Sequence, residues 1–331
     1  MSRPRLAPAV GILLLAGLAV GLILLRMLMD RPPGGSLRLA WPEPSYAVFR
    51  RTAVIVCLLV GSSLGVSGVL LQALLRNPLA SPFILGLSSG AGLGVMLSWF
   101  LADRTGLGLF VAGGETLPAI IGSIVTLAIV YALGQRRGWL DPVSLVLIGV
   151  VVAAICGAVI MMLHHLSPGG VREDITRWMF GRIPQGVATG TLLLTGGLSM
   201  AAIIIAFGCG RAMDAATLGD DEARSIGVPL RRLRTMLFIV AGLLTATAVA
   251  IAGPIGFVGL IAPHATRLLI GPRHAPLVIG AALAGAVLML LAEVASQALH
   301  TGAGRMPVGI FTALLGGPTF IWLLRSGRGQ V

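Results

Sequence analysis

An uncharged, apolar stretch of twenty residues follows the first five residues, L-A-P-A-V-G-I-L-L-L-A-G-L-A-V-G-L-I-L-L (Leu6–Leu25). A helix of about 20 apolar residues is long enough to cross the hydrocarbon core of a bilayer. The stretch is longer than the apolar core of most secretory signals, and no clear small-residue cleavage motif follows it. We therefore predict a first membrane span that is retained in the protein.

The composition extends this prediction to the whole chain. Of the 331 residues, 56% are hydrophobic and 11% are charged, whereas a soluble domain carries about 25% charged residues. We predict an all-α polytopic membrane protein with a single transmembrane domain over residues 1–331. Hydropathy and turn residues mark ten candidate spans, near 6–28, 50–75, 82–101, 116–134, 143–166, 188–208, 234–253, 256–270, 276–297 and 307–324.

The net charge of +12 comes from 24 basic residues, all of them arginines. Most of them flank the predicted spans, where positive residues set topology and contact lipid phosphates. This placement favours a membrane-lipid role for the charge over nucleic-acid binding. Ten spans put both termini on one side, and cytoplasmic termini place fourteen of the 24 arginines inside. The remaining arginines predict a basic outer face that suits an acidic partner or substrate.

The eighth span, 256–270, is too short to cross the membrane as an unbroken helix. It contains Gly256, Gly259 and Pro263, and Pro254 precedes it. Irregular backbone at membrane depth is tolerated only where protein or a water-filled cavity surrounds it. We therefore expect this segment to lie inside the bundle.

The polar segment 210–234 reads as two short helices. Gly219 separates them, and the acidic run 220–222 suits the first turn of the second helix. Gly227 and Pro229 end that helix. Helices this short are marginal on their own, so something must hold them. The segment is either a connector on the membrane surface or a docking element for a cytoplasmic partner.

The residues leave two other functional classes open. A gradient-driven transporter needs an ionisable group at mid-span, and Glu293 is the only carboxylate well inside a predicted span. The chain also lacks a Walker A pattern, so its energy would come from a separate ATPase. An intramembrane serine hydrolase is the other alternative, because Gly61, Ser63 and Gly65 satisfy G-x-S-x-G. No metal site is predicted, because the adjacent His164 and His165 would point about 100° apart on a helix.

Four runs are distinctive when taken together. They are G-V-L-L-Q-A-L-L-R-N-P-L-A-S-P (Gly68–Pro82), L-G-L-S-S-G-A (Leu85–Ala91), A-G-P-I-G-F-V-G-L-I-A-P-H-A-T-R (Ala252–Arg267) and P-V-G-I-F-T-A-L-L-G-G-P-T-F-I-W-L-L (Pro307–Leu324). In these runs the chain resembles the membrane-spanning permeases of type II ABC importers, which take up iron siderophores, haem and vitamin B12. The resemblance covers nearly everything after about residue 45.

The resemblance implies a non-catalytic permease of about ten spans in the bacterial inner membrane, working as a homodimer. Its partners would be two ATPase subunits that bind ATP and Mg²⁺, and a periplasmic substrate-binding protein. No cofactor would be bound by the chain itself. It also implies roles for particular residues. ATPase coupling falls to Asp214, Thr217, Asp220, Asp221, Glu222 and Arg224, and the cytoplasmic gate to Asn77, Leu79, Pro142 and Val143.

On the outer side, the resemblance implies docking of the binding protein by Arg50 and Arg51. It also implies a docking arginine near Gln297 and an acid before M-P-V-G, where this chain has Arg305, so we expect the second basic contact at Arg305. The substrate is approached through W-M-F-G-R-I-P-Q (Trp178–Gln185), where Arg182 stands at a position that is commonly small in the family. A lone arginine at a low-dielectric entrance requires an anion. Haem offers two propionates beside an apolar face that Trp178, Met161 and Met162 could accommodate, so we expect haem. A ferric siderophore or a corrinoid remains the alternative substrate, and a docking or topological role remains the alternative for Arg182.

Overall fold

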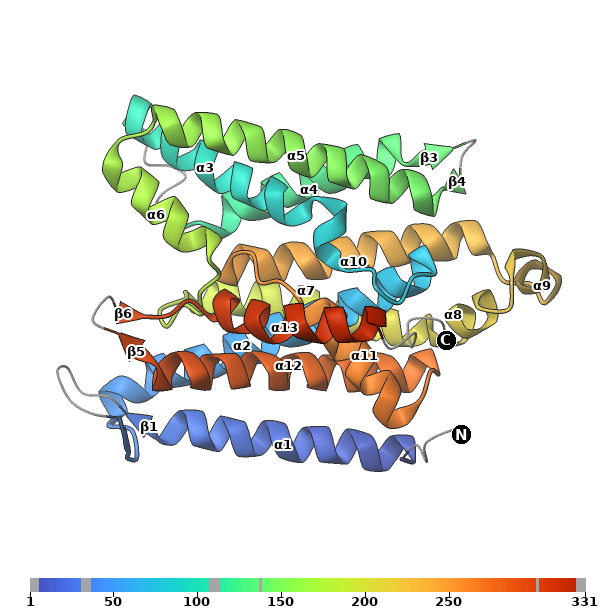
Figure 1. Ribbon diagram of the computed structural model, residues 1–331, viewed down its shortest axis with the longest axis horizontal. Coiled ribbons are helices and arrows are strands. Elements are labelled where there is room, and N and C mark those ends of the chain that lie inside the picture. The colour runs from blue at the N-terminus through green and yellow to red at the C-terminus, as the bar shows by residue number, and fades with distance from the viewer. Residues whose placement is uncertain (1–5, 31–36, 107–113, 137–138, 302–303, 326–331) are drawn as a thin grey trace.

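The computed structural model describes residues 6–30, 37–106, 114–136, 139–301 and 304–325. These residues form long helices that run side by side along the longest axis of the molecule (Figure 1). The helices are α1 (Pro8–Leu28), α2 (Pro44–Leu75), η1 (Pro82–Leu85), α3 (Leu87–Thr105), α4 (Thr116–Leu133), α5 (Pro142–Leu166), α6 (Gly169–Met179), α7 (Thr189–Gly208), α8 (Gly210–Ala216), α9 (Asp220–Ser225), α10 (Leu230–Ala252), α11 (Val258–Ile270), α12 (His274–Ala298) and α13 (Val308–Arg325).

Each of the ten predicted spans coincides with one of these helices, which confirms the predicted fold class. Within the described residues, α1, α2, α4, α5, α7, α10 and α12 are long and apolar enough to cross a membrane. The three remaining spans are α3, α11 and α13. Three antiparallel two-residue hairpins join span ends. They are β1–β2 (Met29–Asp30 with Arg38–Leu39), β3–β4 (Gln135–Arg136 with Trp139–Leu140) and β5–β6 (His300–Thr301 with Gly304–Arg305).

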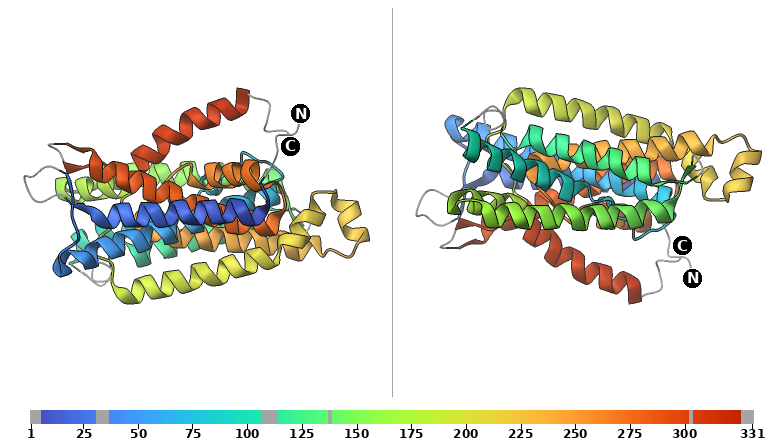
Figure 2. Two further views of the ribbon diagram at one scale, coloured as in Figure 1. Left: turned by 90° about the horizontal axis from the view of Figure 1, so that it is seen from below. Right: turned by 90° about the horizontal axis from the view of Figure 1, so that it is seen from above.

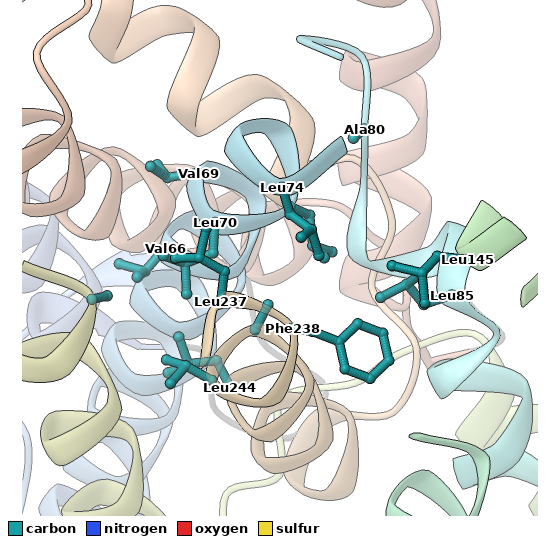
Figure 3. Packing of buried hydrophobic residues seen from close by; sticks show 14 of the residues in the cluster. Val66, Val69, Leu70, Leu74, Ala80, Leu85, Leu145, Leu237, Phe238 and Leu244 are labelled. Atoms are coloured by element: carbon teal, nitrogen blue, oxygen red, sulfur yellow. The ribbon is translucent and has the colours of Figure 1, made fainter. Parts of the chain in front are cut away.

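Helix α2 runs through the centre of the bundle, packed against α10, α11 and α12. Its side chains Val66, Leu70 and Leu74 meet Leu237 and Phe238 of α10 in the main apolar cluster (Figure 3). On its other side, glycines bring backbones together. A Cβ atom on Gly61 would lie 2.3 Å from the carbonyl oxygen of Gly285 in α12. Small residues at such crossings are how membrane helices approach closely.

The structure contains the predicted break in the helical backbone before the eighth span. Helix α10 ends at Gly253 (φ 71°), extended backbone follows, and α11 starts after Phe257 (φ 67°). Protein covers this segment, because Arg182 N–H donates to Ala252 O at 2.8 Å. A Cβ atom on Gly181 would lie 2.7 Å from Pro254 O, so that loop packs directly on the broken backbone. The backbone groups are therefore partnered without a regular helix, as the bilayer requires.

The two ends of the bundle carry different elements. One end, here called the α9 end, holds α8, α9, the β3–β4 hairpin and both termini (Figure 1). The opposite end, the α6 end, holds β1–β2, β5–β6 and α6. Helix α6 was not predicted from the sequence, because it is short and polar rather than a span. Helix α13 leans away from the other helices at the α9 end (Figure 2).

Candidate functional site

The polar segment at the α9 end folds into two helices that are anchored separately to the bundle. They are α8 and α9, with Gly219 (φ 136°) between them and Gly227 (φ 85°) after them. Asp214 of α8 is turned inward: its Oδ1 accepts a hydrogen bond from His274 N–H at 2.9 Å and lies 2.6 Å from His274 Nδ1. Asp214 therefore fixes α8 to the start of α12.

Asp220 anchors α9. Its carboxylate pairs with Arg76 at the end of α2 and accepts two hydrogen bonds of 2.9 Å from Arg234 of α10. Burial acts to raise the pKa of the Asp220 carboxyl, but the charges of Arg234 and Arg76 outweigh it and hold that pKa below its ordinary value. The carboxylate therefore stays ionised at neutral pH and ties α9 to two spans.

Of the remaining predicted coupling residues, Thr217, Asp221 and Glu222 are exposed, whereas Arg224 lies over the ring of Trp139 in the β3–β4 hairpin. The Asp221 side chain is 93% exposed and that of Arg224 is half exposed, and Arg224 Nη1 donates to Asp221 Oδ1 at 2.9 Å. Large apolar side chains share this exposure, Leu218 at 66% and Ile226 at 61%. They were missed in the sequence, although an apolar side chain exposed on a polar segment is itself a signal of a contact surface.

The predicted gate residues also belong to elements of the α9 end. Asn77 Oδ1 accepts a hydrogen bond from Leu79 N–H at 2.9 Å, which forms a tight turn after α2. Pro142 opens α5, and Val143 behind it is 65% exposed. Within the described ranges no hydrogen bond joins one pair to the other. Their role as a constriction stays a prediction.

A buried ion network crosses the α6 end. Glu293 Oε1 of α12 accepts hydrogen bonds from Arg26 Nε of α1 at 3.0 Å and from Arg305 Nη2 at 2.6 Å. The side chains of Glu293 and Arg26 are each 1% exposed, whereas Arg305 is 30% exposed. The one acid well inside a predicted span is therefore neutralised by two arginines. This pairing removes it as a free site for a coupling ion.

The two adjacent docking candidates differ in accessibility. Arg50 is buried, and its guanidinium donates to Met27 O at 2.8 Å and to Asp30 Oδ1 at 2.5 Å. It braces the β1–β2 hairpin and is not free to reach a partner in this arrangement. Arg51 is exposed, so it remains available for docking. The difference follows from helical geometry, because neighbouring residues on a helix point about 100° apart.

A cavity of about 460 Å³ opens at the α6 end, and arginines surround it. Arg177, Arg182 and Arg305 line it together with Phe180 and Glu293. The expectation that Arg182 is unpaired is wrong, because its Nη2 donates to Glu115 Oε1 at 2.9 Å. Its side chain is nevertheless half exposed. The cavity lining contains three guanidinium groups and one carboxylate, and each arginine has an acidic partner: Glu173 for Arg177, Glu115 for Arg182 and Glu293 for Arg305.

The predicted substrate-pathway residues separate into two groups. Trp178 is 2% exposed and packs in an apolar cluster with Ile175 and Val95, so its assignment to the pathway is corrected: in this arrangement it is a core residue. Met161 and Met162 of α5 are 75% and 54% exposed. Neither is among the residues that line the arginine cavity, and their place in a substrate pathway stays a prediction.

The hydrolase alternative fails on the geometry of its nucleophile. Ser63 is fully buried, and its hydroxyl donates to Ser199 Oγ at 3.0 Å. No hydrogen bond links Ser63 to a histidine in the part of the chain that the structure describes. A serine nucleophile needs an adjacent base and access to substrate, and Ser63 has neither here.

Comparisons with known proteins agree with this architecture. Residues 43–326 match the FecCD transport family. The chain belongs to this family. It is 37% identical over 285 residues to the hemin transport system permease protein HmuU of Yersinia pestis, covering 85% of this chain and 83% of that protein. It is 36% identical over 294 residues to the vitamin B12 import system permease protein BtuC of Escherichia coli, covering 87% of each.

A solved structure extends the similarity to three dimensions. It is described as "An inward-facing conformation of a putative metal-chelate type ABC transporter", and it matches with a TM-score of 0.83 at 28% identity. The match covers 96% of this chain and 99% of the other. The chain is thus an ABC importer permease of the haem, vitamin B12 and metal-chelate family, and such a permease works with an ATPase and a substrate-binding protein. The gradient-driven alternative is thereby set aside.

Proposed function

We propose that the chain is the translocation subunit of an ATP-driven importer for an anionic metal chelate, with haem as the first candidate. The observation that supports this proposal is the cavity at the α6 end, where Arg177, Arg182 and Arg305 converge around about 460 Å³. Guanidinium groups bind carboxylates in a bidentate manner, and haem presents two propionates. Phe180 and Met306 in the lining supply apolar and polarisable contacts for a macrocycle.

The same proposal covers the assembly. The permease works as a homodimer in the bacterial inner membrane, with both termini in the cytoplasm. Two ATPase subunits bind ATP and Mg²⁺ and contact α8 and α9. A periplasmic binding protein docks at the α6 end through Arg51 and Arg305. The exposed apolar residues Leu218 and Ile226 support the ATPase contact.

The decisive experiment is reconstitution of the permease with its cognate ATPase and binding protein in proteoliposomes. Uptake of haem, a ferric siderophore and cobalamin would be measured in parallel, with ATP inside. We expect uptake of an anionic chelate, haem first, that stops when the ATPase is omitted. Uptake of cobalamin alone would reject the anionic substrate, and uptake without the ATPase would reject the mechanism.

Arg182→Ala is expected to lower the uptake efficiency for haem about three- to fivefold, the range of a partly solvated ion pair. The reason is the loss of one cationic group from the cavity. Arg182→Lys should restore part of the activity, because lysine keeps the positive charge but lacks the planar guanidinium that binds a carboxylate through two hydrogen bonds. Arg38→Ala, at an arginine outside this cavity that is 62% exposed, is the matched control. Unchanged haem uptake in Arg182→Ala, with normal binding-protein association, would contradict the substrate role.

The double variant Asp221→Asn with Glu222→Gln is expected to weaken copurification of the ATPase about fivefold, since rim charges contribute up to about 1 kcal/mol. These carboxylates are exposed and hold no span in place. Asp220→Asn should act differently, because it releases α9 from Arg76 and Arg234, and it should raise amide exchange in α9 even without a partner. Glu173→Gln, an exposed acid of α6, is the control. Normal copurification and transport in the double variant would argue against α9 as the docking element.

A further inference from the structure

A long apolar groove lies over α3, between α4 and α5, with a volume of about 740 Å³. Its walls are exposed side chains spaced four residues apart, so each helix presents one continuous stripe to the groove. Glycines of α3, Gly90 and Gly94, form part of its floor. The wall residues are Ile121, Val125, Ile129 and Leu133 on α4, and Leu147, Val151 and Ile155 on α5, all at least 40% exposed.

The groove is long enough to hold a lipid acyl chain from one leaflet. From Pro118 to Leu133 it follows α4 for fifteen residues, or roughly 22 Å at the helical rise. One leaflet contributes about half of a hydrocarbon core that is about 30 Å thick. A chain from the leaflet on the α9 side would therefore fit along the groove without reaching its far end.

A second cavity, of about 420 Å³, lies at the α9 end where α4 and α5 are joined by the β3–β4 hairpin. Its lining contains Arg136, Arg224 and Arg234, with Asp141 as its one acid. Leu133, the last groove residue of α4, precedes Arg136 by three positions. The groove and the cavity are thus lined by successive positions of the same segment, from α4 into β3 and from β4 into α5.

The three arginines differ in what they already bind. Arg136 is exposed and has no hydrogen bond or ion pair to any residue that the structure describes. Arg234 donates from Nη2 to Asp220, and Arg224 from Nη1 to Asp221. Each guanidinium has five N–H donors, so both retain donors for another acceptor.

The lining of the cavity also contains a tryptophan, Trp139, a residue type common at the membrane interface. Trp139 is opposite Arg136 in the hairpin and lies 5.2 Å from the guanidinium carbon of Arg224, measured to the ring centroid. Tryptophan is enriched where the hydrocarbon meets the headgroups, and basic pockets between spans bind anionic headgroups.

We propose that the groove and the cavity together form one binding site for an anionic phospholipid of the leaflet on the α9 side. Its acyl chain lies between the stripes of α4 and α5, and its phosphate is bound by Arg136 with support from Arg224 and Arg234. Asp141 also lines the cavity, and its Oδ2 is held by Ser144, whose N–H and Oγ–H donate to it at 2.8 and 2.6 Å. The site does not depend on which substrate the permease carries.

The test is native mass spectrometry of the delipidated, full-length permease with equal amounts of phosphatidylglycerol and phosphatidylethanolamine that share the same acyl chains. We expect preferential retention of phosphatidylglycerol. Arg136→Ala should lower that retention about fivefold, the effect of one arginine near a charged headgroup. Arg231→Ala, at an exposed arginine outside the cavity, should leave retention unchanged.

Groove variants test the other half of the site. Val125→Trp and, separately, Val151→Trp should fill the groove and lower retention of both lipids, whereas Leu193→Trp on the exposed face of α7 should not. Equal retention of the two lipids by the wild-type chain would overturn the proposal, and so would unchanged retention in Arg136→Ala. A disulfide between two copies of the Val125→Cys variant would show that a second protein chain occupies the groove, and this outcome would also overturn the proposal.

Discussion

Glu293→Gln is expected to destabilise the folded chain by about 3 to 5 kcal/mol, the cost of leaving a buried charge without its partner. Glu293 is the acceptor for Arg26, and each of these side chains is 1% exposed. Arg26 could not reach water without pulling α1 away from α12. The expected readout is a large fall in the apparent Tm of the purified permease, together with a loss of folded protein in membranes.

Two further variants separate the ion network from simple loss of packing. Arg26→Met combined with Glu293→Gln should recover much of the lost stability, because the buried cation is removed as well. Arg305 can then hydrate, since its side chain is 30% exposed. Arg38→Ala breaks an ion pair whose arginine is 62% exposed and should cost less than about 1 kcal/mol. A Tm of Glu293→Gln equal to that of Arg38→Ala would mean that the network does not stabilise the fold.

Gly61→Ala is expected to destabilise the bundle by about 1 to 3 kcal/mol, the usual cost of overpacking a core. The added Cβ would lie 2.3 Å from Gly285 O and 2.7 Å from Ala286 Cα. Both are backbone atoms, so no side-chain rotation can make room. Helices α2 and α12 would have to separate at the centre of the molecule, which should lower the Tm and the yield of folded permease.

The matched control is Gly157→Ala in the middle of α5, where an added Cβ meets nothing within 4 Å. Alanine is favoured over glycine in a helix by about 1 kcal/mol, so this variant should be neutral or slightly more stable. A normal Tm for Gly61→Ala would refute the close crossing of α2 and α12. A fall in both variants would instead point to a general intolerance of substitution.

The spans and the two short helices at the α9 end could be predicted because their signals are local. A bilayer demands about 20 apolar residues for each crossing helix, and this requirement is readable in any window of the chain. Gly219 and Gly227 adopt positive φ at the expected breaks, as glycine does most readily. Helix α6 was missed because its residues carry no comparable hydropathy signal.

Roles of individual side chains were less predictable, since charge is visible in a sequence but pairing is not. Arg50 and Arg51 are adjacent and chemically identical, yet one is buried against Asp30 and the other is exposed. Arg182 was expected to be unpaired, and its partner Glu115 lies 67 residues away. Trp178 was expected to be accessible, and packing from α3 and α10 covers it.

The amino-acid sequence by itself determined the membrane class, the number and positions of the spans, the interruption before α11 and the family motifs. These properties depend on hydropathy and backbone preference, which act over neighbouring residues. Only the tertiary structure decided that Glu293 is shared by Arg26 and Arg305, that three arginines line one cavity, and that side chains of α4 and α5 form an apolar groove. Such arrangements join residues far apart in the chain, and their energies depend on distance and burial that exist only after the helices have packed.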